Sequence, residues 1–231
     1  MKNIYYIVLL LLLVFFGCTK KNTANQTTTS SEDSLTTYLS KANDFGSTTK
    51  VRQEYIQKAF SIIINQENDS LQRANLFRVA NRYYNLNDWK KYQEIAQIVL
   101  EKAINSKDTV STAKAYSYLG DYYVSQGISD TAFLYYFKAE KIYLQQNENY
   151  NLARTRLNKA QLQYNESDYL GCENSAFKAL RVIKGENADD ILYELYNLLG
   201  LVYNELGEYE KAIEYHAKAL KTINNEKTPV E

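Results

Sequence analysis

The chain has 231 residues, and its 27 lysines and arginines balance its 27 aspartates and glutamates, so the formal net charge is zero. A balanced charge gives no general reason to expect nucleic acid or an anionic membrane surface as a partner. Only one proline and eight glycines occur. Because a chain of many short strands needs frequent turn residues, this composition argues against an all-β fold and favours long helices.

The N-terminal segment has the pattern of an export signal. Lys2 precedes 13 consecutive apolar residues, 4–16, a run too short to cross a bilayer comfortably but typical of a signal peptide. Gly17 and Cys18 follow, and they resemble the lipobox of bacterial lipoproteins, in which a small residue precedes a cysteine that is lipidated. We therefore predict a lipoprotein-type signal peptide at residues 1–18, with Cys18 as the lipidation site.

Residues 19–32 are rich in Thr, Ser and Asn and contain no large apolar side chain. Such a segment cannot offset the entropy cost of ordering by burial, so we expect a flexible tether. A lipid on Cys18 would anchor the chain in the cell envelope, and we predict the periplasmic side of the outer membrane. The alternative interpretation is an ordinary secretory signal followed by an incidental cysteine.

Between positions 33 and 226 the chain repeats itself with a period of about 40 residues. Within each repeat, apolar residues recur at the spacing of one helix face. Five positions mark the period, namely Ala59, Val99, Ala139, Ala179 and Ala219. Periodicity of this length is typical of a solenoid, in which each unit buries its apolar surface only against its neighbours.

The most regular repeat lies near the C-terminus. Residues 196–220 read YNLLGLVYNELGEYEKAIEYHAKAL, and residues 116–140 repeat much of this pattern of Leu-Gly, Tyr, Gly and Ala positions. Both segments resemble the tetratricopeptide repeat (TPR), and the signatures decide against the HEAT and armadillo repeats that the period also allows. The resemblance implies an all-α fold, an α–α superhelix of about five helical hairpins.

Local signals predict how these hairpins turn. Gly127 and Gly207 are expected to adopt the left-handed conformation that ends the first helix of a pair. Ser129, which an acid follows, is expected to cap the next helix. Only five positions separate Tyr164 from Tyr169, so the turn of the fourth repeat is predicted to be one residue short.

No pattern of catalytic residues emerges. The single histidine, His216, falls where Tyr136 lies in the third repeat, and without a catalytic partner it is expected to pack against the paired helix. If Cys18 is lipidated, Cys172 has no disulfide partner and is expected to be a small buried residue. One histidine forms no metal-spaced cluster, and no P-loop, G-x-S-x-G or G-x-G-x-x-G motif occurs. We predict no enzyme activity, no metal site and no cofactor.

In TPR proteins the first helix of each pair lines a concave surface. Asn side chains there offer donors and an acceptor to a peptide backbone. The predicted partner-binding groove consists of Phe77, Asn81, Tyr84, Asn85, Asp121, Asn158, Asn165, Asn197 and Asn204. The alternative is plain surface polarity in an Asn-rich chain. The Lys-x-x-x-Asn pair with which some TPRs grip a chaperone's C-terminal carboxylate is absent, because Phe77 and Ser117 occupy the lysine positions.

These features predict a lipid-anchored scaffold that mediates protein–protein interactions in the bacterial cell envelope. Its partner would be a protein or peptide segment of another envelope protein, and not nucleic acid. TPR lipoproteins of about this length occur in outer-membrane β-barrel assembly and pilus assembly. The alternative is the N-terminal sensor region of an envelope regulator with a kinase or DNA-binding output, whose remainder lies outside this chain. Residues 227–231 are predicted to be a tail.

Overall fold

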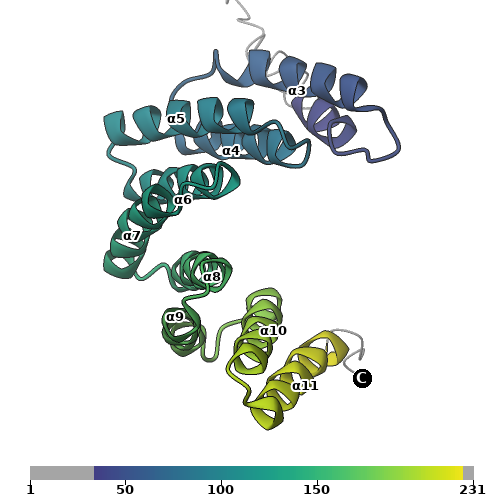
Figure 1. Ribbon diagram of the computed structural model, residues 1–231. Coiled ribbons are helices and arrows are strands. Elements are labelled where there is room, and N and C mark those ends of the chain that lie inside the picture. The colour runs from purple at the N-terminus through teal and green to yellow at the C-terminus, as the bar shows by residue number, and fades with distance from the viewer. Residues whose placement is uncertain (1–33, 226–231) are drawn as a thin grey trace, which may run out of the picture.

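The computed structural model describes residues 34–225, which form an open arc of helices (Figure 1). A helical segment at residues 34–41 pairs with α3, and four further hairpins follow. The helices are α3 (Thr49–Ile63), α4 (Ser70–Tyr84), α5 (Trp89–Asn105), α6 (Thr109–Ser125), α7 (Ser129–Gln146), α8 (Asn149–Asn165), α9 (Tyr169–Val182), α10 (Asp189–Glu205) and α11 (Tyr209–Asn225). The predicted all-α superhelix of five hairpins is confirmed for this part of the chain.

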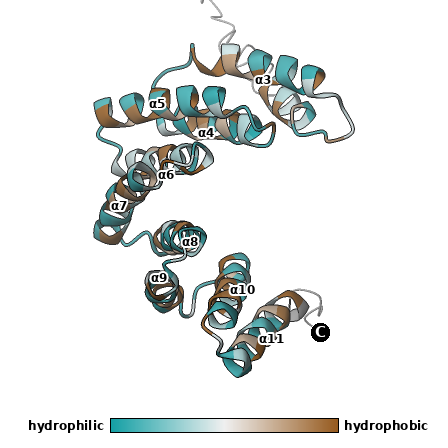
Figure 2. Ribbon diagram, viewed as in Figure 1, coloured by the Kyte–Doolittle hydropathy of each residue, from teal (hydrophilic) through white to brown (hydrophobic). Residues whose placement is uncertain are grey.

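Successive helices pack against each other along the whole array. The first helices of the last four hairpins, α4, α6, α8 and α10, lie toward the inside of the arc, while α5, α7 and α9 cover the outside (Figure 1). Every labelled helix carries both hydrophobic and hydrophilic residues (Figure 2), as expected for helices that bury one face and expose another. The first helices therefore form most of the concave side, as the TPR resemblance implies.

Most turns between the helices share one construction. Two positions before a helix begins, the backbone has a positive φ, and the next residue donates its N–H to the carbonyl five positions earlier. Ile128 donates in this way to Tyr123 at 2.9 Å, and Glu208 donates to Tyr203 at 2.8 Å. The residues with positive φ, between 55° and 76°, are Asn87, Lys107, Gly127, Asn147, Ser167 and Gly207. The predicted left-handed conformation of Gly127 and Gly207 is confirmed, and the same bond closes turns without glycine.

The predicted cap at Ser129 is wrong. The N-cap of α7 is Ile128, which forms no side-chain cap bond, and Ser129 is the first helical residue. Because the turn already closes at Ile128, the Ser129 hydroxyl lies inside the helix and donates to Glu166 Oε1 at 2.6 Å. The side chain therefore links two neighbouring hairpins instead of capping its own helix.

The turn of the fourth hairpin is not short. Residues 166–168 separate α8 from α9, just as residues 126–128 separate α6 from α7. The prediction is wrong because Tyr164 does not hold the position of Tyr203 in the repeat; Gln163 is the residue that lies one full period before Tyr203. Because Tyr164 lies one position after the residue equivalent to Tyr203, the turn looked one residue shorter than it is.

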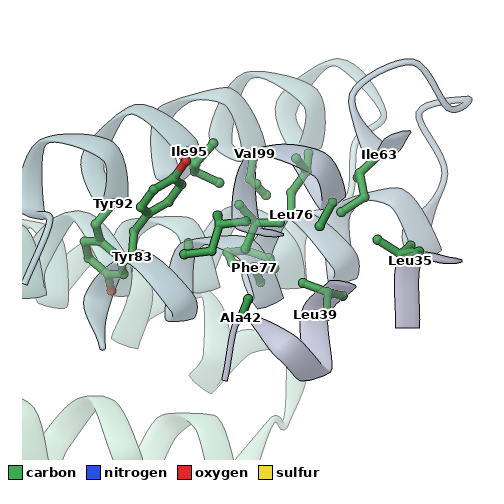
Figure 3. Close-up of a cluster of buried hydrophobic side chains, with 14 of the residues drawn as sticks. Leu35, Leu39, Ala42, Ile63, Leu76, Phe77, Tyr83, Tyr92, Ile95 and Val99 are labelled. Atoms are coloured by element: carbon green, nitrogen blue, oxygen red, sulfur yellow. The ribbon is translucent and has the colours of Figure 1, made fainter. Parts of the chain in front are cut away.

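The apolar core runs between the helix layers in two large clusters. One joins residues 34–41 with α3, α4 and α5, and Figure 3 shows its side chains, including Leu76, Phe77 and Val99. The other extends from α8 to α11 and contains Cys172 and Leu195. Neighbouring hairpins share each cluster, so the hairpins support one another as expected for a solenoid.

The predicted signal peptide at residues 1–18 with Cys18, the tether at 19–32 and the tail at 227–231 lie outside the described residues. Within residues 34–225, none of the helices combines the length and the apolar character that crossing a membrane requires.

Candidate functional site

The concave side contains a hollow of about 400 Å³ that α4, α5, α6, α7 and α8 surround. Its lining combines aromatic rings, side-chain amides and one carboxylate. The aromatic residues are Tyr84, Trp89, Tyr92, Tyr118 and Tyr136, and the amides are Asn81, Asn158, Gln161 and Asn165. The carboxylate is Asp121 on α6. A hollow of this composition is a candidate binding site, because its polar side chains converge on one space among apolar ring surfaces.

The aromatic rings form a wall at the turn between α4 and α5. Tyr84 ends α4 and Trp89 begins α5, and their rings meet edge to face at a centroid distance of 5.0 Å. Tyr92, one turn farther along α5, contacts both rings and stacks on Tyr118 of α6 at 5.3 Å. Because each ring touches another, the wall is preorganised.

Asp121 lies at the centre of a hydrogen-bond network that joins three hairpins. Its Oδ1 accepts from the Tyr136 hydroxyl at 2.6 Å and from Asn158 Nδ2 at 3.2 Å. Its Oδ2 accepts from the Tyr92 hydroxyl at 2.9 Å. Burial raises the pKa of Asp121 to about 6, although the three hydrogen bonds favour the ionised form. The carboxylate is therefore mostly ionised at neutral pH but sensitive to mild acid.

Five of the nine predicted groove residues line the hollow, namely Asn81, Tyr84, Asp121, Asn158 and Asn165. Asn81 lies beside the Tyr118 hydroxyl. Asn165 accepts from Gln161 at 3.3 Å and is exposed at the edge. The structure thus brings together residues from α4, α6 and α8 that are far apart in the sequence.

The other four predicted residues do not line the hollow. The placement of Phe77 in the groove is wrong: it is only 3% exposed and packs in the core against Tyr118, because it lies one turn too deep on α4 (Figure 3). Asn85 is exposed and donates to Asn43 at 3.4 Å. Two residues lie on α10, where Asn197 contacts the ring of His216 at 3.1 Å and Asn204 is exposed.

Sequence reasoning missed Trp89, Tyr92 and Tyr136, which line the hollow from the second helices of their hairpins. The prediction considered only first helices as groove-forming. The sequence shows these aromatic residues on the buried faces of their helices. It does not show whether the polar end of such a side chain lies in the core or at a cavity.

His216 and Cys172 lie outside the hollow. The His216 ring packs so closely on α10 that a Cβ added at Gly200 would approach it to 2.6 Å, which confirms the predicted packing role. Cys172 is buried, and burial raises the pKa of its thiol to about 12, so the thiolate is not available at neutral pH. In the described part of the chain, no group of three His, Cys, Asp or Glu side chains is arranged to hold a metal ion.

No family model and no curated sequence matches the chain. Several solved structures, in contrast, match the chain. BtubC (BKLC) from P. vanneervenii is 17% identical, with a TM-score of 0.65 over 91% of this chain and 96% of that chain. A putative kinesin light chain of nearly identical TPR-like repeats from Podosopora anserina is 10% identical, with a TM-score of 0.57 over 84% and 97%. The chain has the TPR fold.

The TPR array is also similar to aspartyl phosphate phosphatase F from Bacillus subtilis, at 17% identity and a TM-score of 0.69. That match covers 85% of this chain but only 49% of the phosphatase. At these levels of identity the likeness establishes the fold alone, and function must be argued from the site.

Proposed function

We propose that the TPR array is an interaction scaffold that binds a segment of a partner protein along its concave side, centred on the hollow. The observation that supports this most is the convergence of α4, α6 and α8 on a preorganised aromatic and amide surface. Such a surface offers ring faces for side chains and amides for a backbone, which extended peptide segments require.

The exposed amides at the edge of the hollow provide the test. The double variant Gln161→Ala/Asn165→Ala removes two exposed amides from α8 and should weaken partner binding about thirtyfold, since each of the two lost hydrogen bonds costs about 1 kcal/mol. The helix should tolerate both changes because alanine is the better helix former. Binding is measured by quantitative mass spectrometry of proteins captured from an envelope extract.

The matched control is Gln97→Ala/Gln145→Ala, which removes two exposed amides from the second helices α5 and α7. Its captured proteins should equal those of the wild type. Equal capture by both double variants, with unchanged melting temperatures, would show that the concave side is not the binding surface.

We further propose that the scaffold is held in the cell envelope by a lipid on Cys18, facing the periplasm from the outer membrane. The lipobox-like Gly17 and Cys18 after a short apolar run support this. Cys18→Ser should move the protein from the membrane fraction to the soluble fraction, because stable anchoring requires the acyl chains. Detection of the variant in the membrane fraction at the wild-type level would exclude lipidation as the anchor.

A further inference from the structure

Asp121 is the only charged residue among the described residues that line the hollow. The chain contains 27 lysines and arginines, yet none of those within residues 34–225 contributes to this lining. The concave hollow is therefore acidic in a chain whose formal net charge is zero.

Two other half-buried carboxylates of the array, those of Asp108 and Glu140, have basic partners. Asp108 pairs with Arg73 at 2.9 Å, and Glu140 pairs with Arg156 at 2.8 Å and with Lys159 at 2.6 Å. Burial raises the pKa of each, but the hydrogen bonds and these cations lower it below the ordinary value on balance. Asp121 differs, because within the described residues its hydrogen-bond partners are neutral and no cation counters its burial.

The Asp121 carboxylate also has room for a further donor. A carboxylate offers about four acceptor positions, and three donors reach Asp121 from within residues 34–225. Oδ1 receives two of them, and Oδ2 receives only the Tyr92 hydroxyl. The remaining position on Oδ2 suits an N–H donor that arrives from the hollow.

Three rings of the aromatic wall beside Asp121, those of Tyr84, Trp89 and Tyr92, are likewise unused by cations of the described residues, whereas Lys114 lies over the Tyr118 ring at 6.0 Å. Elsewhere, lysines lie over aromatic rings, as Lys138 does over Tyr135 at 5.1 Å and Lys218 over Tyr215 at 4.3 Å. Among the cation–ring contacts of the described residues, none involves the rings of Tyr84 or Trp89. A cation near aromatic faces and a carboxylate gains from both.

We propose that the hollow accepts a cationic side chain, lysine or arginine, of the partner segment, with Asp121 as its counter-ion and the aromatic wall around its stem. This inference rests on the proposed concave binding of a protein segment. A volume of about 400 Å³ admits such a side chain together with part of the adjoining backbone. The amides of Gln161 and Asn165 at the edge would then contact that backbone.

The test uses peptides selected on the purified chain from a phage-displayed random library. The selected peptides should share a lysine or arginine. Each is then synthesised in a charged form and in a neutral form, with acetyl-lysine or citrulline at that position. Neutralisation should weaken binding to the wild type about tenfold or more, as the loss of one charge-assisted hydrogen bond implies.

Asp121→Asn preserves the shape of the side chain and should bind the charged and neutral peptides equally. Glu101→Gln, an exposed acid-to-amide change on α5, is the matched control and should keep the wild-type preference. Equal binding of both peptides by the wild type, or a preference that survives in Asp121→Asn, overturns the inference.

Proton linkage supplies a second measurement. The titratable groups around Asp121 are Tyr84 on α4, Tyr92 on α5, Tyr118 on its own α6, and Tyr136 and Tyr143 on α7, whereas α8 contributes the amide of Asn158. Burial raises the pKa of all five phenols, so only Asp121 changes charge in mild acid. Binding of the charged peptide should weaken as the pH falls through about 6, by up to about tenfold per pH unit. Binding that is independent of pH there would contradict the counter-ion role.

The two proposals can fail separately. If Gln161→Ala/Asn165→Ala weakens binding of both peptide forms but charge has no effect, the concave site stands and the cation preference is wrong. If this double variant binds every peptide as the wild type does, or if no peptide is selected, both proposals are wrong.

Discussion

The third hairpin, α6–α7, and the fifth, α10–α11, share a packing device and differ in what surrounds it. Tyr136 lies on Gly120 in the third hairpin, and two repeats later His216 lies on Gly200. An added Cβ would approach these rings to 2.5 Å and 2.6 Å, respectively. Both hairpins therefore need glycine at this position, because the second helix brings a ring against the backbone of the first.

The two hairpins differ at the residue that follows each glycine. In the third it is Asp121, which accepts the Tyr136 hydroxyl, and in the fifth it is Leu201, which is 36% exposed. The ring of His216 contacts Asn197 instead, one turn earlier on α10. The repeat thus preserves the contact between helices, while the positions that packing leaves free carry the chemistry of the concave side.

The largest effect is expected from adding a methyl group beneath the rings. Gly120→Ala should destabilise the protein by about 2–3 kcal/mol, because Tyr136 is 2% exposed and hydrogen-bonded, so its ring cannot move away. Gly200→Ala should cost only about 1 kcal/mol, since the half-buried His216 can shift toward solvent. Urea unfolding of both variants measures the difference, and equal losses would show that the two contacts are equally rigid.

The next effect concerns the charge of Asp121. Its pKa of about 6 in the folded protein exceeds the ordinary value of 3.8, so its contribution to stability is fully present below about pH 4 and is lost as the pH rises through about 6. Asp121→Asn should remove this dependence and be more stable than the wild type near pH 7.5 by about 1–2 kcal/mol. Melting temperatures of the wild type and Asp121→Asn across this pH range show which protein is more stable and whether the difference grows with pH. A gap between the two proteins that stays constant with pH would refute the raised pKa.

The smallest effect is expected from making the fifth hairpin resemble the third. His216→Tyr should change stability by less than about 0.5 kcal/mol, because tyrosine fits over a glycine but loses the contact with Asn197. Adding Leu201→Asp supplies the acceptor that Tyr136 has in the third hairpin. A double-mutant cycle should then give a favourable coupling of about 1 kcal/mol between the two changes. The absence of coupling would mean that the ring positions of the two hairpins are not equivalent.

The sequence by itself determined the helical hairpins and much of the concave surface. A helical pattern that recurs in every repeat specifies which side of each helix is buried, since neighbouring helices have only each other to pack against. The same pattern placed Asn81, Asp121 and Asn158 on first helices, where the structure finds them lining one hollow. Glycine indicated two of the turns in the sequence. The same left-handed conformation occurs at four residues whose type did not predict it, namely Asn87, Lys107, Asn147 and Ser167.

Only the tertiary structure determined how deeply each side chain is buried and which residues it contacts. Phe77 and Asn81 share a face of α4 one turn apart, yet the first is in the core and the second lines the hollow, because the next hairpin covers only part of that face. Asp121 receives its hydrogen bonds from residues 29 positions before it and 15 and 37 positions after it. Helical periodicity describes one helix at a time, whereas the curvature of the array determines which helices meet, and this sets both the burial of Asp121 and its pKa.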